Sequence, residues 1–179
     1  MRQEIRLSGF GGQGIVLAGY ILGKALAIYD GREAVMTQAY GPEARGGASC
    51  ANIVVSDKPI DYPIVQRPDV LVALSQEAYT KFESTTKPDA IIIIDADLVN
   101  PPDYGRHHAI PATRLAERLG RRIVTNVVML GFFTSVTNLV SREAMEQAIR
   151  SSVRPKTVPL NLDAFAAGYG YALQKELRS

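Results

Sequence analysis

The fold of this 179-residue chain is decided near its start, by the stretch Glu4-Ile5-Arg6-Leu7-Ser8-Gly9-Phe10-Gly11-Gly12-Gln13-Gly14-Ile15. The first half of this stretch is typical of a strand, and the second half is a glycine-rich turn that opens a helix-like segment. Glycines permit a tight turn and a close backbone approach, and the unpaired N–H groups at the positive helix end attract an anion. The order of strand, glycine turn and helix therefore predicts a site for phosphate.

Two well-known phosphate motifs fit this turn poorly. Gly9, Gly11 and Gly14 have the G-x-G-x-x-G spacing of dinucleotide folds, but those folds need an acidic residue at the end of the second strand. The second predicted strand ends Thr37-Gln38-Ala39-Tyr40, which contains no carboxylate. A P-loop needs Gly-Lys-Ser/Thr, whereas here Ile15-Val16 follows the last glycine. The alternative that the glycines only allow a tight turn stays open.

A second glycine-containing loop, Gly41-Pro42-Glu43-Ala44-Arg45-Gly46-Gly47, separates two predicted strands. It holds one acid and one base on a backbone that is rigid at the proline and permissive at the glycines. Arginine binds carboxylate or phosphate in a bidentate manner, so Arg45 is a candidate anion clamp. A surface pair between Glu43 and Arg45, or a loop buried against another subunit, fits the same residues equally well.

Apolar runs and turn residues predict the remaining elements. The expected strands are 4–8, 34–38, 50–55, 70–74, 90–95 and 109–111, and the expected helices are 15–28, 76–82, 112–119, 126–139, 142–151 and 162–177. The four consecutive isoleucines Ile91–Ile94 predict a central strand that is buried on both faces. The expected helix N-caps are Ser75, Ser141, Asn126 and Asn161, and Pro155 and Pro159 are expected to belong to a connection before the last helix. We expect one α/β domain over residues 1–179, a three-layer α/β/α sandwich with a mostly parallel, mixed, Rossmann-like sheet.

Bulk composition narrows the functional classes. The chain has 20 Lys+Arg and 18 Asp+Glu, which gives no indication of a nucleic-acid or membrane-surface protein. A charged N-terminus and the lack of a long apolar run predict a cytoplasmic protein without a signal peptide or membrane span. Cys50 is the one cysteine, so this chain alone holds no disulfide and no iron–sulfur cluster. His107 and His108 point to opposite faces of a strand, and we predict no metal site and no catalytic residue.

Six segments, in order along essentially the whole chain, resemble the gamma subunit of the 2-oxoacid:ferredoxin oxidoreductases. The likeness is to small separate gamma subunits of the 2-oxoglutarate or 2-ketoisovalerate type, rather than to the fused pyruvate enzymes. The segments are Gly9–Ile15, Tyr40–Gly47, Pro68–Gln76, Ala109–Ala112, Asn126–Gly131 and Asn161–Phe165.

The resemblance implies a complex that oxidatively decarboxylates a 2-oxoacid with coenzyme A, giving an acyl-CoA, carbon dioxide and reduced ferredoxin. It implies that thiamine diphosphate, magnesium and iron–sulfur clusters belong to alpha, beta and delta-type partner subunits, and that this chain alone is inactive. The gamma chain would help to bind coenzyme A and cover the catalytic subunits. The cofactor-binding residues implied by loop chemistry and family motif together are Gly11, Gly12, Gln13, Gly14, Arg45, Gly46, Gly47 and Asn126.

Two other functions compete with this interpretation. One is a stand-alone NAD or flavin dehydrogenase, against which the missing acid at the second strand counts. The other is a purely structural subunit that seals the assembly and binds no coenzyme. The anion-binding character of both glycine-containing loops argues against that second alternative.

Overall fold

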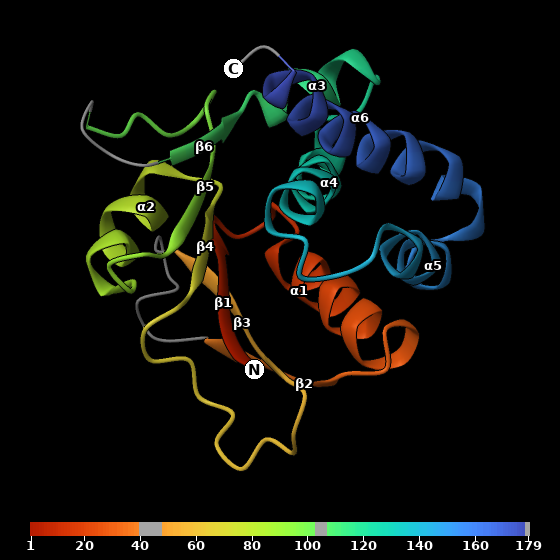
Figure 1. Ribbon diagram of the computed structural model, residues 1–179. Helices are drawn as coiled ribbons and strands as arrows, with labels where there is room; N and C mark the ends of the chain where they lie inside the picture. Colours follow the sequence, from red (N-terminus) through yellow and green to blue (C-terminus); the bar gives the residue numbers. More distant parts are fainter. Residues whose placement is uncertain (40–47, 103–106, 178–179) are drawn as a thin grey trace.

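The computed structural model describes residues 1–39, 48–102 and 107–177. Within these ranges a six-stranded sheet has the order β2-β3-β1-β4-β5-β6 (Figure 1). The strands are β1 (Arg2–Gly9), β2 (Glu33–Ala39), β3 (Ser49–Ser56), β4 (Val70–Ala73), β5 (Ile91–Asp95) and β6 (His107–Ile110). β1, β4, β5 and β6 are parallel, whereas β3 is antiparallel to both β1 and β2. The predicted mixed α/β sheet is therefore confirmed.

Helices cover both faces of this sheet, but unequally (Figure 1). Among the helices of the described residues, α2 alone packs on one face, where it contacts β1 and β4. The other face carries a thick helical layer in which α1 lies on β3 and α4 packs against α6. The helices are α1 (Ile15–Lys24), α2 (Gln76–Phe82), α3 (Ala112–Arg118), α4 (Thr125–Thr137), α5 (Arg142–Ser152) and α6 (Val158–Glu176). None of the helices in the described ranges has the length and apolarity that crossing a bilayer requires.

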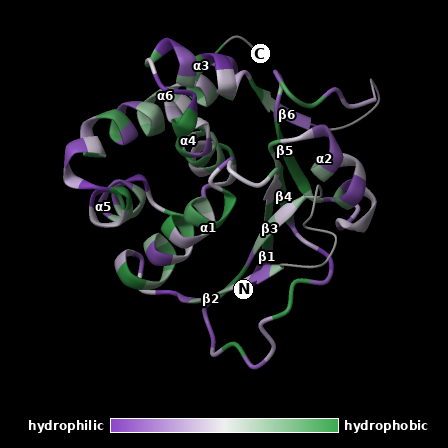
Figure 2. Ribbon diagram, turned by 180° about the vertical axis from the view of Figure 1, so that it is seen from behind, coloured by the Kyte–Doolittle hydropathy of each residue, from purple (hydrophilic) through white to green (hydrophobic). Residues whose placement is uncertain are grey.

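The main core lies between the sheet and the thick helical layer. Figure 2 shows the hydrophobic residues concentrated on the central strands and on α4. Neighbouring isoleucines of β5 enter different cores, because successive side chains of a strand point to opposite faces. Ile93 joins the main core, and Ile94 joins a smaller cluster beneath α2. The predicted burial of this strand on both faces is confirmed at these two residues.

Two predicted N-caps are confirmed by hydrogen bonds. The Ser75 hydroxyl accepts from the Ala78 N–H at 3.1 Å, and the Ser141 hydroxyl accepts from the Ala144 N–H at 3.1 Å. Each serine therefore satisfies one of the unpaired N–H groups in the first turn of its helix. The sequence placed the starts of α2 and α5 correctly because these caps are local.

The predicted start of the last helix is wrong. α6 begins at Val158, and Asn161 lies inside the helix, where its Nδ2 donates to the Thr157 carbonyl at 2.9 Å. Pro159 was expected to belong to a connection, but proline is tolerated in a first helical turn because the N–H it lacks has no partner there. The prediction that Asn126 caps α4 is also wrong, since that helix begins one residue earlier, at Thr125.

Candidate functional site

The glycine turn follows β1 and opens α1 at the carboxyl edge of the parallel strands (Figure 1). The Gln13 N–H donates to the Phe10 carbonyl at 3.2 Å, which closes a tight turn. Gly12 and Gly14 have φ angles of 87° and 73°, a left-handed backbone that glycine adopts without steric cost. The sequence therefore predicted this turn correctly, and glycine is required at two of its positions.

The side chain of Gln13 fastens the turn to the neighbouring strand. Its Oε1 accepts from the Phe10 N–H at 2.6 Å, and its Nε2 donates to the carbonyl of Leu74, just beyond β4, at 2.9 Å. Both ends of the carboxamide are therefore engaged within the protein. Gln13 shapes the turn, and its predicted contact with a ligand stays a prediction.

Asn126 holds the same turn from the other side. Its Nδ2 donates to the Gly14 carbonyl at 3.1 Å, while its Oδ1 accepts from the Val127 N–H at 2.9 Å. The amide packs so closely on Gly14 that a Cβ atom there would overlap Nδ2. The structure thus brings two predicted site residues together, although they are distant in sequence. Asn126 is only 4 % exposed and positions the turn.

A cavity of about 270 Å³ lies beside the turn at this edge of the sheet. Its lining comes from the glycine turn, the end of β4, the segment after β5, the start of α3 and the turn before α4. The lining residues are Gly12, Gln13, Leu74, Leu98, Thr113, Arg122, Ile123 and Thr125. Within the described residues, no hydrogen bond is donated by the N–H groups of Gly11 and Gly12, and a Cβ atom on either would meet open space.

Arg122 is a cavity residue that sequence reasoning missed. It precedes the Asn126 segment by one turn, and the Arg121-Arg122 pair was a signal of local positive charge. Its Nη1 lies 3.9 Å from Glu117 Oε1, and both side chains are more than half exposed. The cation that was predicted, Arg45, and the adjacent Gly46 and Gly47 lie outside the described residues.

A buried carboxyl supports the cavity wall at the end of β5. Asp95 is fully buried; the Thr113 hydroxyl donates to its Oδ2 at 2.6 Å, and the Asp97 N–H donates to its Oδ1 at 3.0 Å. Burial raises the pKa of the Asp95 carboxyl, because desolvation disfavours the charged form and outweighs these hydrogen bonds. Asp95 therefore anchors Thr113 at the start of α3.

The raised pKa of Asp95 predicts a pH-dependent effect of Asp95→Asn. The folded protein binds the proton more tightly than the unfolded chain, so stability falls as pH rises from the ordinary carboxyl pKa through the raised one. Above both values the ionised carboxylate costs stability, and asparagine removes that cost. Its Oδ1 can still accept from the Asp97 N–H, and its Nδ2 can donate to the Thr113 hydroxyl, which reverses the direction of that hydrogen bond.

Thermal melts of wild type and Asp95→Asn at several pH values check this expectation. The variant should melt at a higher temperature at pH 7, and the difference should shrink toward pH 4. Asp61→Asn, at an exposed position, serves as the control. A lower melting temperature for Asp95→Asn at pH 7 would show that the charged hydrogen bonds outweigh desolvation.

The other titratable candidates make structural contacts. Cys50 is buried, its Sγ lies 3.3 Å from the Ser8 hydroxyl, and burial raises the pKa of its thiol. His107 Nε2 lies 2.8 Å from the Tyr79 hydroxyl oxygen. In the part of the chain that the structure describes, no three His, Cys, Asp or Glu side chains are grouped as metal ligands.

The fold and the site define an α/β domain with a glycine turn and a cationic cavity at the carboxyl edge of its sheet. The model of the family "Pyruvate ferredoxin/flavodoxin oxidoreductase" matches residues 4–171. The chain therefore belongs to this family, as the resemblance in its motifs predicted.

Individual relatives agree with this assignment. The chain is 54 % identical over 182 residues to the 2-oxoglutarate synthase subunit KorC of Methanocaldococcus jannaschii, with 99 % of this chain and 96 % of the relative covered. It is 43 % identical to the solved gamma subunit of a keto/oxoacid ferredoxin oxidoreductase from Geobacter sulfurreducens. That match has a TM-score of 0.86 and covers 96 % of this chain and 99 % of the other.

A third match is to a much longer chain. The 2-oxoglutarate:ferredoxin oxidoreductase from Magnetococcus marinus, solved with 2-oxoglutarate, coenzyme A and succinyl-CoA bound, matches with a TM-score of 0.86 at 23 % identity. The match covers 97 % of this chain but 31 % of that one. At this identity the likeness establishes a shared fold, and it shows that this fold also occurs within a larger polypeptide.

Proposed function

We propose that this chain, as the gamma subunit of a 2-oxoacid:ferredoxin oxidoreductase, forms one wall of a coenzyme A site that partner subunits complete. The observation that carries the proposal is the cavity beside the glycine turn. Gly12 and Arg122 line this cavity, and the N–H groups of Gly12 and of the adjacent Gly11 have no partner among the described residues. Backbone N–H groups at a helix start and an arginine suit the phosphates of coenzyme A.

The reaction that we assign to the assembly converts 2-oxoglutarate, coenzyme A and oxidised ferredoxin to succinyl-CoA, carbon dioxide and reduced ferredoxin. 2-Oxoglutarate is the substrate class that fits the KorC relatives. The thiol of coenzyme A accepts the acyl group. The residues of this chain bind and orient the coenzyme's phosphate end, since Gln13 and Asn126 hold the turn in shape.

We assign the remaining chemistry to alpha, beta and delta-type subunits, which would hold thiamine diphosphate, magnesium and iron–sulfur clusters and pass electrons to ferredoxin. The donor set of this chain supports that division. It has one cysteine, and that thiol is buried against Ser8. Exposed apolar side chains near the cavity suit a partner's surface, because Phe10 is 46 % and Ile123 is 69 % exposed.

The topology argues against the dehydrogenase alternative. In a dinucleotide fold the strand beside the first one is parallel to it and ends in an acid that binds ribose. Here the antiparallel β3 separates β2 from β1. The parallel neighbour is β4, and it ends Ala73-Leu74-Ser75, without a carboxylate.

Titration of the assembled complex with coenzyme A separates our proposal from a purely structural subunit. We expect Gly12→Val to weaken coenzyme binding about tenfold or more, because valine is strained at a φ of 87° and narrows the cavity. Gly31→Val is the matched control, since Gly31 also has a positive φ with open space around it but does not line the cavity. Equal affinity for wild type and Gly12→Val would favour a structural role.

A further inference from the structure

We propose that Arg122 binds a phosphate group of coenzyme A in the cavity beside the glycine turn. This inference rests on the proposed function and adds a residue that neither the motifs nor the loop chemistry indicated. Among the described residues that line the cavity, Arg122 is the one with a charged side chain. The other lining residues are apolar, glycine, or neutral polar side chains.

The backbone of Arg122 is held rigidly. It begins a 3-10 turn, Arg122–Val124, that leads directly into α4. The Thr125 hydroxyl donates to the Arg122 carbonyl at 2.7 Å, and Val124 is buried beneath the turn. The flexible side chain therefore extends from a backbone that is already ordered, so little backbone entropy is lost when it binds a ligand.

The turn that carries Arg122 is also tied to the glycine turn. Asn126, one helical turn later, donates to the Gly14 carbonyl at 3.1 Å. One turn of α-helix rises about 5.4 Å, which is within the reach of an extended arginine side chain. Arg122 and the glycine turn are consequently connected through Asn126, and Arg122 and Gly12 line the same cavity.

The charges around the cavity leave Arg122 available. The pair with Glu117 spans 3.9 Å between exposed side chains, and such pairs contribute little to stability. Asp97, the other nearby acid, pairs with Arg114 at 2.6 Å, and Asp95 is buried behind Thr113. The hydroxyls of Thr113 and Thr125 already donate within the protein. A phosphate in this cavity would therefore meet a cation without a competing carboxylate in the lining.

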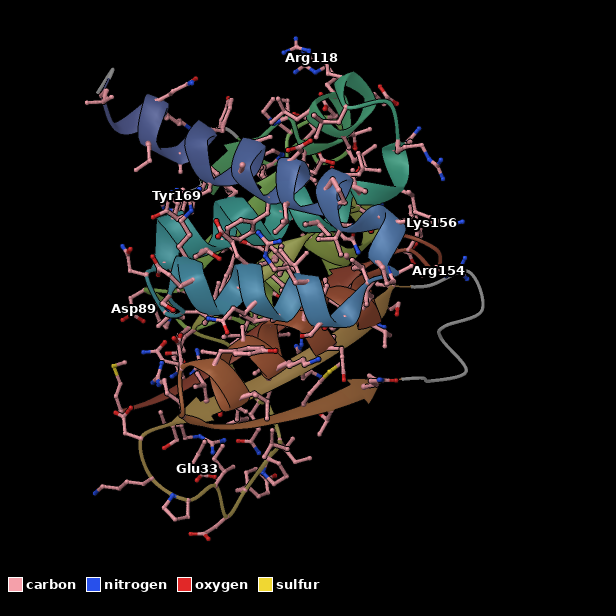
Figure 3. The ribbon with its side chains drawn as sticks, turned by 90° about the vertical axis from the view of Figure 1, so that its right-hand side faces the viewer. Glu33, Asp89, Arg118, Arg154, Lys156 and Tyr169 are labelled. Carbon is pink, nitrogen blue, oxygen red and sulfur yellow. The ribbon has the colours of Figure 1, made fainter. Side chains whose placement is uncertain are left out.

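Two other basic residues provide matched controls. Arg121 adjoins Arg122 in sequence and is exposed, but it does not line the cavity. Lys156 lies in the connection between α5 and α6, and Figure 3 shows its side chain pointing outward from the body of the protein. Neither side chain makes an ion pair with the described residues. Substituting either one removes the same net charge as a change at Arg122.

The test is isothermal titration of the assembled complex with coenzyme A, at low and high salt. We expect Arg122→Gln to weaken binding about tenfold, which corresponds to about 1.4 kcal/mol, and to reduce the salt dependence of the affinity. Arg122→Lys should recover part of the loss, because lysine keeps the charge but not the bidentate geometry. Arg121→Gln and Lys156→Gln should bind as wild type does.

Four results would overturn the inference. Equal losses in Arg122→Gln and Arg121→Gln would indicate a general charge effect. If the Arg122→Gln subunit separated from the complex on size-exclusion chromatography, the guanidinium would instead pair with an acidic side chain of a partner subunit. Wild-type affinity in Arg122→Gln, together with weak binding in Gly12→Val, would refute the role of Arg122 and leave the proposed function standing. Wild-type affinity in both would refute the proposed function as well.

Discussion

Gly168→Ala should lower the stability of the subunit by about 3 kcal/mol or more, which corresponds to a fall of about 6–12 °C in melting temperature. A Cβ atom at Gly168, in α6, would overlap the Val128 carbonyl oxygen and lie 2.9 Å from the Phe132 nitrogen, both in α4. These are backbone atoms, which no side-chain rotation can move. The two helices would have to separate, and the buried contacts between them would loosen.

The matched control for this change is Gly170→Ala in the same helix. A Cβ atom at Gly170 meets nothing within 4 Å, so alanine there gains helix propensity without a clash. We expect that variant to be more stable by about 1 kcal/mol, which gives the two substitutions opposite signs. Thermal and urea unfolding of both purified variants measure the difference. A Gly168→Ala variant as stable as Gly170→Ala would show that α4 and α6 are not in backbone contact.

The reciprocal position tests the same contact from α4. A Cβ atom at Gly131 would overlap the Phe165 carbonyl oxygen and lie 2.8 Å from the Tyr169 nitrogen. Because either alanine opens the same gap, the Gly131→Ala/Gly168→Ala double variant should lose less stability than the sum of the single losses. Strict additivity would indicate two independent defects.

Gly14→Ala should cost about 2–3 kcal/mol of stability and also weaken coenzyme A binding by the complex. The φ of Gly14 is 73°, and this left-handed conformation costs alanine about 1–2 kcal/mol of stability. Its Cβ would also overlap Asn126 Nδ2 and lie 3.0 Å from Asn126 Cγ. The asparagine must therefore move, and the hydrogen bond to the Gly14 carbonyl is lost with it.

A double-mutant cycle with Asn126→Ala separates the backbone strain from the clash. Truncating Asn126 removes the overlapping amide, so the cost of Gly14→Ala should be smaller in the Asn126→Ala background than in wild type. Gly31→Ala is the control for backbone strain alone, because Gly31 has a φ of 66° and open space around it. If Gly14→Ala and Gly31→Ala lost the same stability, the contact with Asn126 would carry no energy.

The parts of the fold that the sequence predicted depend on short-range interactions. The serine caps of α2 and α5 act within one helical turn, so three or four neighbouring residues contain the whole signal. The isoleucine run of β5 predicted burial on both faces because alternation along a strand is a local rule. The start of α6 was missed because Pro159 suits both a connection and a first helical turn.

The candidate site was predicted only in part. The glycine turn is local and was found where expected, after β1 and before α1. The engagement of Gln13 with the Leu74 carbonyl was not predicted, because it depends on β4 being the neighbour of β1. The cavity position of Arg122 was also missed, because it depends on another contact between distant segments, the one between α4 and the glycine turn.

By itself the sequence determined the α/β class, the glycine turn and the family, because motifs and hydrophobic periodicity depend only on residues that are close together in the chain. Only the tertiary structure decided which strand adjoins β1, that Asn126 clamps Gly14, and that Arg122 joins the cavity. It also decided that Gly131 and Gly168 let α4 and α6 touch. These facts arise when distant segments pack together, and close packing depends on the shapes of both partners at once.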